Sequence, residues 1–267
     1  MGVAHFSVLP DIGSLYSSNF SIEPNGLQGI IALFNMIPIT DLKEKRPSAI
    51  RELFGRIAPR YDLMNRLMTA GQDKRWREEV IRRAHLRPGA SLLDLGAGTG
   101  DLSFEALRQE PRVHPTAADF TLEMMREGQK RGILPWLGAD ALQLPFRDRT
   151  FDSVVSGFLM RNVHDVQQAL REQLRILKPG GYIVVLDTTK PKRNLLSPFI
   201  WTHFHIVLPM LGRLIAGQAS AYSYLSQSTE GFLRAEQLAA RMAAAGFHQI
   251  GFQVRMFGTI AIHWGQK

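Results

Sequence analysis

Residues 92–100 read LLDLGAGTG, an apolar run that carries one acid, Asp94, and ends in three alternating glycines, Gly96, Gly98 and Gly100. Glycine has no Cβ, so the backbone of such a loop can adopt dihedral angles that other residues avoid and can pass close beneath a ligand. Residues 101–107 can then begin a helix whose first amides are free to face a polar or anionic group. The stretch predicts a strand, a loop and a helix that cradle a nucleotide-type ligand.

The composition narrows the class of protein. A chain of 267 residues suffices for one sizeable α/β domain. The chain has no cysteine, which excludes disulfides, thiolate metal sites and a cysteine nucleophile. No apolar run reaches the roughly 18 residues that a membrane-spanning helix needs.

The formal net charge of +8 favours an anionic partner or, equally, a basic face that only solvent contacts. The basic residues gather between Lys43 and Arg83 and again between Lys178 and Arg193. No nucleic-acid-binding motif with interleaved aromatic residues accompanies them. We therefore expect no nucleic-acid partner and rank an anionic membrane surface next.

Residues 1–45 differ from the rest of the chain. They are rich in Ser, Asn, Gly and Pro and hold no Lys or Arg before Lys43, so they lack the early basic region of a secretory signal. We expect either a disordered extension or a start codon assigned too early, with the true start at Met36. Residues 46–267 are predicted to form one domain.

Apolar periodicity places helices and strands along this domain. Helices are predicted near residues 48–57, 61–68, 76–84, 101–107, 122–131, 166–177 and 235–245. Strands are predicted at residues 91–95, 113–119, 134–139, 151–156, 182–186, 250–256 and 259–264, with a turn at 178–181. Pro115 weakens the second strand, because proline cannot donate to a ladder. The order predicts an α/β fold: a mostly parallel seven-stranded sheet, helices on both faces and a C-terminal antiparallel hairpin.

Two further acids follow predicted strands. Asp119 ends the second strand about 20 residues beyond the glycines, where a carboxylate can accept both ribose hydroxyls of a nucleoside. Asp140, followed by Ala141, ends the third strand and could accept from an adenine amino group. Each acid alone could equally be a helix cap or a turn residue. Because the carboxyl ends of parallel strands meet at one edge, three acids there favour a ligand site.

The glycine spacing indicates which nucleotide binds. Dinucleotide folds carry G-x-G-x-x-G, whereas this loop reads G-x-G-x-G, so an NAD-dependent oxidoreductase is the less favoured alternative. The acid before the loop, the acid at strand two and the Asp-Ala pair at strand three resemble class I S-adenosylmethionine-dependent methyltransferases, which have a Rossmann-like fold. The resemblance implies S-adenosylmethionine as the cofactor. The residues it assigns to cofactor binding are Asp94, Gly96, Gly98, Thr99, Gly100, Asp119, Asp140, Ala141 and Gly157.

A narrower resemblance covers roughly residues 53–267. The chain is similar to the ubiquinone/menaquinone biosynthesis C-methyltransferases in FGRIAPRYDLMN (54–65), DALQLPF (140–146), RNV (161–163), RILKPGG (175–181), YSYL (222–225) and GTIAIH (258–263). It departs from that family at FLMRN (158–162), which lacks the usual glycine before the last three residues, and at DTTKP (187–191), where the family commonly has EFSKP. Both departures lie beside the expected substrate pocket.

This resemblance implies methyl transfer from S-adenosylmethionine to a ring carbon of a polyprenylated quinol, with demethylmenaquinol the favoured substrate. The ring carbon becomes nucleophilic once the neighbouring hydroxyl, with a pKa of about 10, loses its proton. Catalytic roles are implied for Arg161 in stabilising the phenolate, for Asn162 in holding the hydroxyl or a water, and for His164 as a base. No metal is expected. O- or N-methylation of another small molecule is the alternative.

The resemblance also suggests how the substrate is held. Tyr222 and Tyr224 are expected at the substrate pocket, and residues 190–233 are expected to form a lid over an isoprenoid tail, a core helix being the other reading. Such a quinol resides in a bilayer. We therefore expect a cytoplasmic protein that associates weakly with the inner face of the plasma membrane, and a homodimer stays open.

Overall fold

The computed structural model describes residues 47–190, 228–229 and 231–267. The predicted extension, residues 1–45, lies outside the described residues. So does most of the predicted lid at 190–233, including Tyr222 and Tyr224.

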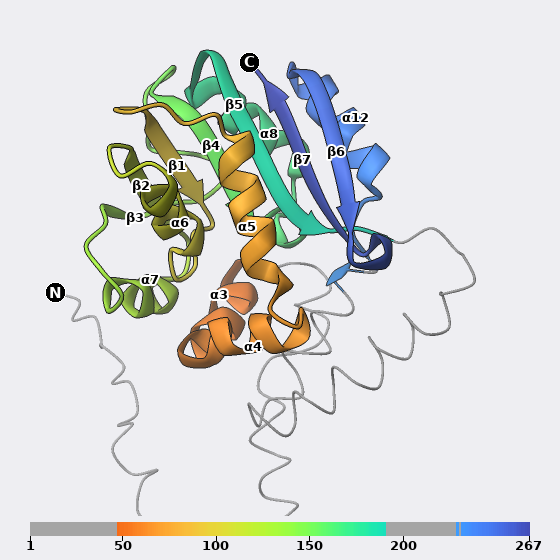
Figure 1. The fold of residues 1–267 in the computed structure, drawn as a ribbon. Coiled ribbons are helices and arrows are strands. Elements are labelled where there is room, and N and C mark those ends of the chain that lie inside the picture. Colours follow the sequence, from red (N-terminus) through yellow and green to blue (C-terminus); the bar gives the residue numbers. More distant parts are fainter. Residues whose placement is uncertain (1–46, 191–227, 230) are drawn as a thin grey trace, which may run out of the picture. The chain divides into compact units, whose positions relative to one another are not determined.

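A seven-stranded sheet forms the centre of the described domain, in the order β3-β2-β1-β4-β5-β7-β6 (Figure 1). The strands are β1 (Ser91–Leu95), β2 (His114–Asp119), β3 (Trp136–Gly138), β4 (Phe151–Gly157), β5 (Leu177–Thr188), β6 (His248–Arg255) and β7 (Ile260–Gln266). Strands β1 to β5 run parallel, and β7 pairs antiparallel with both β5 and β6. The predicted fold class, including the C-terminal hairpin, is confirmed.

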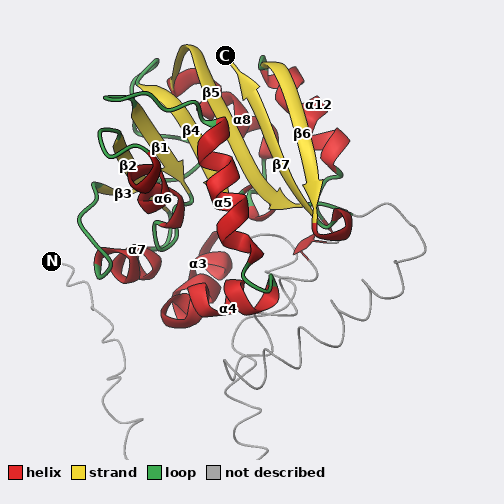
Figure 2. Cartoon of the chain, viewed as in Figure 1, coloured by secondary structure: helices red, strands yellow, loops and turns green. Residues whose placement is uncertain are grey.

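Helices cover both faces of this sheet (Figure 2). They are α3 (Pro47–Ile57), α4 (Tyr61–Met68), α5 (Gln72–Arg83), α6 (Asp101–Gln109), α7 (Leu122–Gln129), α8 (Val166–Ile176) and α12 (Ala235–Ala245). Helices α5 and α6 share one apolar core with the sheet, and α8 and α12 share the core on the opposite face. Helices α3 and α4 have a small core of their own, beyond the carboxyl ends of the parallel strands.

Strand β1 shows why its sequence is almost wholly apolar. Leu92 packs into the core beneath α5 and α6, whereas Leu93 and Leu95 pack into the core beneath α8. Successive side chains of a strand point to opposite faces, so a central parallel strand needs apolar residues on both. Asp94 interrupts this apolar pattern, although its side chain is only 1% exposed. A buried carboxylate within an apolar strand indicates a functional role, because burial without a partner is costly.

Pro115 lies inside β2 without disrupting it. The amide of Ala117, two residues along, points toward β3 and donates to Pro135 O at 2.9 Å. Position 115 faces the same side, but β3 begins only opposite Ala117. The missing N–H of proline therefore falls where no neighbouring strand needs it.

Most element bounds differ from the prediction by one to a few residues, and two of the differences change the sheet. The stretch 178–181 is not a turn before β5 but part of it, where the register shifts from the Phe151–Leu177 pair to the Ser153–Tyr182 pair. The backbone absorbs the extra residues partly at Gly180, whose φ is +76°. Strand β3 is also shorter than predicted and covers only Trp136–Gly138.

Candidate functional site

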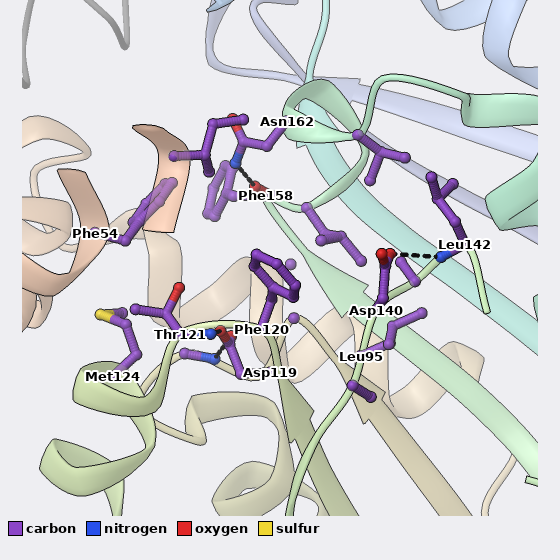
Figure 3. Close-up of a pocket in the computed structure, with 18 of the residues that line it drawn as sticks. Phe54, Leu95, Asp119, Phe120, Thr121, Met124, Asp140, Leu142, Phe158 and Asn162 are labelled. Atoms are coloured by element: carbon purple, nitrogen blue, oxygen red, sulfur yellow. Dashed lines mark hydrogen bonds between the residues drawn. The ribbon is translucent and has the colours of Figure 1, made fainter. Parts of the chain in front are cut away.

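A cavity of about 870 Å³ opens at the carboxyl edge of the parallel strands (Figure 3). Its walls come from the segments that follow β1, β2, β3 and β4 and from helices α3 and α4. They include Ile50, Phe54, Tyr61, Gly96, Gly98, Asp119, Phe120, Thr121, Met124, Asp140, Ala141, Gly157, Phe158, Asn162, Val163 and His164. This volume includes space open to solvent; a concave site lined by apolar and aromatic side chains with a few polar groups is typical of small-molecule binding.

The glycine loop forms the floor of this cavity. Gly96, Gly98 and Gly100 all have positive φ, at +68°, +58° and +84°, a conformation that side chains with a Cβ rarely adopt. A Cβ on Gly96 would also lie 2.9 Å from Leu159 Cδ1. Gly96 and Gly98 line the cavity. Gly100 instead begins α6 and packs under Trp136, so its role is to shape the loop.

Asp94 lies beneath the loop and lines a smaller adjoining cavity. Its Oδ2 accepts hydrogen bonds from Ser103 N at 3.0 Å and Ser103 Oγ at 2.9 Å. Its Oδ1 is buried and has no hydrogen-bond partner among the described residues. Burial raises the pKa of Asp94 to about 7. A buried acceptor without a partner beside a glycine cradle fits a ligand that brings its own donor or positive charge.

Asp119 and Asp140 lie at the carboxyl edge of the parallel strands, as predicted. Asp119 accepts from Gly98 N and Thr121 N, both at 2.7 Å, so it holds the glycine loop and faces the cavity (Figure 3). Burial raises its pKa above the ordinary value of an aspartate. Asp140 is exposed, and its Oδ1 accepts from Leu142 N at 2.9 Å. Both carboxylates keep lone pairs for further donors.

Helix α4 contributes residues to which the sequence assigned no role. Tyr61 is half-buried and lines both cavities. Asp62 accepts a 2.7 Å hydrogen bond from Thr99 Oγ1 in the glycine loop, and Arg131 bridges Asp62 and Asp101. A sequence signal for Tyr61 and Asp62 was present, because both lie in the RYDLMN stretch that resembles the family. Their contact with the glycine loop, however, depends on how α4 packs across the strand ends.

Of the three predicted catalytic residues, two line the cavity and the third lies outside its lining. Asn162 and His164 line the cavity, and Asn162 donates its amide to Phe158 O at 3.1 Å (Figure 3). Arg161 does not line it in the part of the chain that the structure describes. Its guanidinium is 5% exposed, donates to Asp187 Oδ1 at 3.1 Å, and lies 5.0 Å from the ring centroid of Phe158. Contrary to the expectation from the sequence, Arg161 therefore does not contact the cavity directly but lies behind Phe158, which does.

The remaining predicted positions fall around the loop. Ala141 and Gly157 line the main cavity, and Thr99 and Gly157 line the smaller one. No group of His, Cys, Asp and Glu residues suited to a metal ion occurs among the described residues. Among those residues, too, no helix is both long and apolar enough to cross a membrane.

A glycine cradle, an acid at the end of β2 and a buried acid with one unpartnered oxygen beneath the loop are the site features of a class I S-adenosylmethionine-dependent methyltransferase. The fold agrees with solved structures of that class. A S-adenosylmethionine-dependent methyltransferase from Thermotoga maritima, described as a possible histamine N-methyltransferase, superposes with a TM-score of 0.54 at 20% identity, over 81% of this chain and 99% of that one. At this identity the likeness concerns the fold alone.

Sequence comparison identifies the particular family. The ubiE/COQ5 methyltransferase family matches residues 39–267, and the chain belongs to it. The chain is 45% identical to a ubiquinone/menaquinone biosynthesis C-methyltransferase of Desulfotalea psychrophila, over 82% of this chain and 90% of that protein. It is 42% identical to a demethylmenaquinone methyltransferase of Thermus thermophilus, over 80% of this chain and 100% of that protein.

These findings confirm the predicted family and cofactor. The protein is a C-methyltransferase that uses S-adenosylmethionine. The O- or N-methyltransferase alternative is not favoured by relatives of this kind, and neither is an NAD-dependent oxidoreductase.

Proposed function

We propose that this protein methylates a ring carbon of a polyprenylated quinol, with demethylmenaquinol as the substrate. The observation that carries the proposal is the mixed lining of the cavity. Carboxylates at the end of β2 and just after β3 line it together with apolar and aromatic side chains, among them Ile50, Phe54, Phe158 and Val163. An apolar wall with few polar groups suits a flat quinol ring. Relatives named for demethylmenaquinone support the same substrate.

The cofactor fits the acids on the strand-end side. We assign Asp119 to the ribose hydroxyls and Asp140 to the adenine amine, with Ala141 beside it. The unpartnered Oδ1 of Asp94 would face the amino acid end. Gly96, Gly98 and Gly157 leave the space for close approach. When bound, S-adenosylmethionine supplies an activated methyl group. The protein contributes chiefly alignment of that methyl with the ring carbon.

The quinol hydroxyl must lose its proton, and its pKa of about 10 means that the site has to favour the anion. Asn162 would hold the hydroxyl or a water, and His164 at the cavity rim would accept the proton. Arg161 would act from behind Phe158 through its charge, which burial leaves poorly screened. The substrate's tail would extend toward the part of the chain that contains Tyr222 and Tyr224.

A substrate of this kind resides in a bilayer, so the proposal includes peripheral association with the inner face of the cytoplasmic membrane. The net charge of +8 supports contact with anionic lipid. Assembly into a homodimer is left to measurement.

The substrate can be tested by methyl transfer from radiolabelled S-adenosylmethionine. Demethylmenaquinol should accept label on its ring carbon, and a demethylated benzoquinol should accept it more slowly. Isothermal titration with S-adenosylmethionine alone serves as the control that the protein is competent. Absence of product with both quinols, despite cofactor binding, would overturn the assignment.

Cofactor affinity should depend on pH through Asp94. With a pKa of about 7, this carboxyl is ionised at pH 8 and mostly neutral at pH 6, and only the ionised form attracts the cationic amino acid end. Protonation of Asp94 alone would lower affinity about tenfold over this range. The ligand's own amine, with a pKa of about 7.8, gains a proton over the same range. Its positive charge would raise affinity about two- to threefold and so offset part of the loss.

We therefore expect the dissociation constant measured by titration calorimetry to rise about fourfold from pH 8 to pH 6. The Asp94→Asn variant should bind more weakly at pH 8, and its affinity should not fall on acidification. A wild-type dissociation constant that is flat or decreases toward pH 6 would contradict the role assigned to Asp94.

A further inference from the structure

Helix α4 exposes two large apolar side chains on one face. Leu63 is 52% exposed and Leu67 is 44% exposed. Residues four apart in a helix lie one above the other, so the two leucines form a single ridge. Figure 1 shows α3 and α4 beyond the ends of the parallel strands, at the lower side of the domain. Single exposed leucines are ordinary, but an aligned pair beside a site mouth invites an explanation.

Exposed basic residues occur on α4 and in the chain segments that flank it. Arg60, Arg66, Lys74 and Arg75 are all exposed. The two acids of the same stretch are directed inward. Asp62 bonds to Thr99 of the glycine loop, and Asp73 is buried against Arg77. We define the α4 ridge as Leu63 and Leu67 together with these four basic residues.

The ridge lies on the outer side of the helix that closes the cavity. Tyr61, at the start of α4, lines the cavity from within, and Phe54 of α3 lines it beside Tyr61. One helix thus presents an aromatic residue to the site and leucines to the outside.

We propose that the α4 ridge is the surface by which this protein docks on an anionic lipid bilayer. Leu63 and Leu67 would enter the headgroup region, and the basic residues would lie near lipid phosphates. This arrangement, apolar residues flanked by arginine and lysine, is that of interfacial helices. The inference deepens the proposed function, because it places the mouth of the quinol site against the phase in which the quinol resides.

A second copy of this chain is a less suitable occupant. Two leucines bury far less area than a stable protein interface requires. A symmetric pairing through the ridge would also bring the four basic residues of each copy together, and like charges facing each other oppose association. Anionic lipid removes both difficulties, because its charge is opposite and its surface is deformable.

Vesicle co-sedimentation of the full chain, without quinol, tests the docking surface. Wild-type protein should bind vesicles that mix phosphatidylglycerol with phosphatidylcholine more strongly than phosphatidylcholine alone. The Leu63→Gln/Leu67→Gln variant should lose about tenfold or more in partition. The Arg66→Gln/Lys74→Gln/Arg75→Gln variant should lose the preference for anionic vesicles together with its salt dependence. Val254, 46% exposed on edge strand β6, provides the matched control as Val254→Gln, which should bind like wild type.

Each variant is first shown to be folded, by its melting temperature and by S-adenosylmethionine titration. Equal vesicle binding by the leucine variant and the wild type would overturn the proposal. A dimer of the wild type that the leucine variant dissociates, with vesicle binding unchanged, would assign the ridge to a contact between copies instead. Because no quinol is present, either result leaves the proposed substrate to be judged by the methyl-transfer assay.

Discussion

The Asp119→Ala variant is expected to bind S-adenosylmethionine about a hundredfold more weakly than the wild type. Asp119 is half-buried at the cavity and already accepts from Gly98 N and Thr121 N. Its remaining lone pairs would accept the ribose hydroxyls, and each hydrogen bond to a charged group contributes about 1.5–3 kcal/mol. Removal would also leave the amide of Gly98 without its acceptor, so the glycine loop would be less well ordered for the cofactor.

Titration calorimetry gives the affinity, and melting temperature in the absence of cofactor reports on the fold. Asp140→Ala is the matched control, since Asp140 also follows a strand and lines the cavity but is exposed. It should lose only about tenfold or less, because water competes for its hydrogen bonds. Cofactor affinity that survives Asp119→Ala within a factor of three would refute the assignment to the ribose.

The second large effect concerns the buried pair of Arg161 and Asp187, which are 4% and 1% exposed. Asp187→Leu should lower the free energy of unfolding by about 3–5 kcal/mol, because it leaves a buried cation without a partner. Arg161→Met should cost less than Asp187→Leu. Asp187 keeps backbone donors from Arg161 and Thr188 in that variant, whereas Arg161 stays charged and loses its acceptor when Asp187 is replaced. The double variant should recover much of the lost stability.

Urea denaturation of the wild type, the two single variants and the double variant gives the free energy of unfolding of each. Methyl transfer measured on the same four proteins separates an effect on the fold from an effect on catalysis. If the charge of Arg161 stabilises the phenolate, the folded double variant will bind cofactor normally and turn over at least about a hundredfold more slowly, which corresponds to about 2.7 kcal/mol. Arg131→Met, which removes a half-exposed arginine bonded to Asp62 and Asp101, should cost about 1 kcal/mol or less. Wild-type turnover by the double variant would show that Arg161 serves the fold only.

Much of the fold follows from local patterns in the chain. Glycines at alternate positions after Leu95 permit the positive φ that a tight loop requires, and the apolar run of β1 needs cover on both faces, so both could be predicted. The bounds of α12 agree with prediction because its alanine-rich run ends at Gly246, which adopts φ +110°. The stretch 178–181 was mistaken for a turn because its Pro-Gly-Gly composition is typical of turns, whereas hydrogen bonds from Gly180 N to Lys267 O and from Lys267 N to Gly181 O hold it within β5.

The cofactor side of the site could likewise be anticipated. Asp94, Asp119 and Asp140 lie within, at or just beyond the carboxyl end of a parallel strand, and parallel strands bring these ends to one edge whatever their exact length. The partners of α4 could not be anticipated in this way. The hydrogen bond from Thr99 to Asp62 joins residues 37 apart, and it exists only because α4 packs across the strand ends.

The amino-acid sequence by itself determined the class of this protein, its cofactor loop and the edge of the sheet where ligands bind. These depend on periodicity, glycine spacing and strand order, which are properties of short segments. Only the tertiary structure decided that Arg161 turns behind Phe158 to meet Asp187 and that Leu63 and Leu67 stay outside. The direction of a side chain depends on which residues of distant segments fill the space around it, and that is set by packing and not by the local pattern.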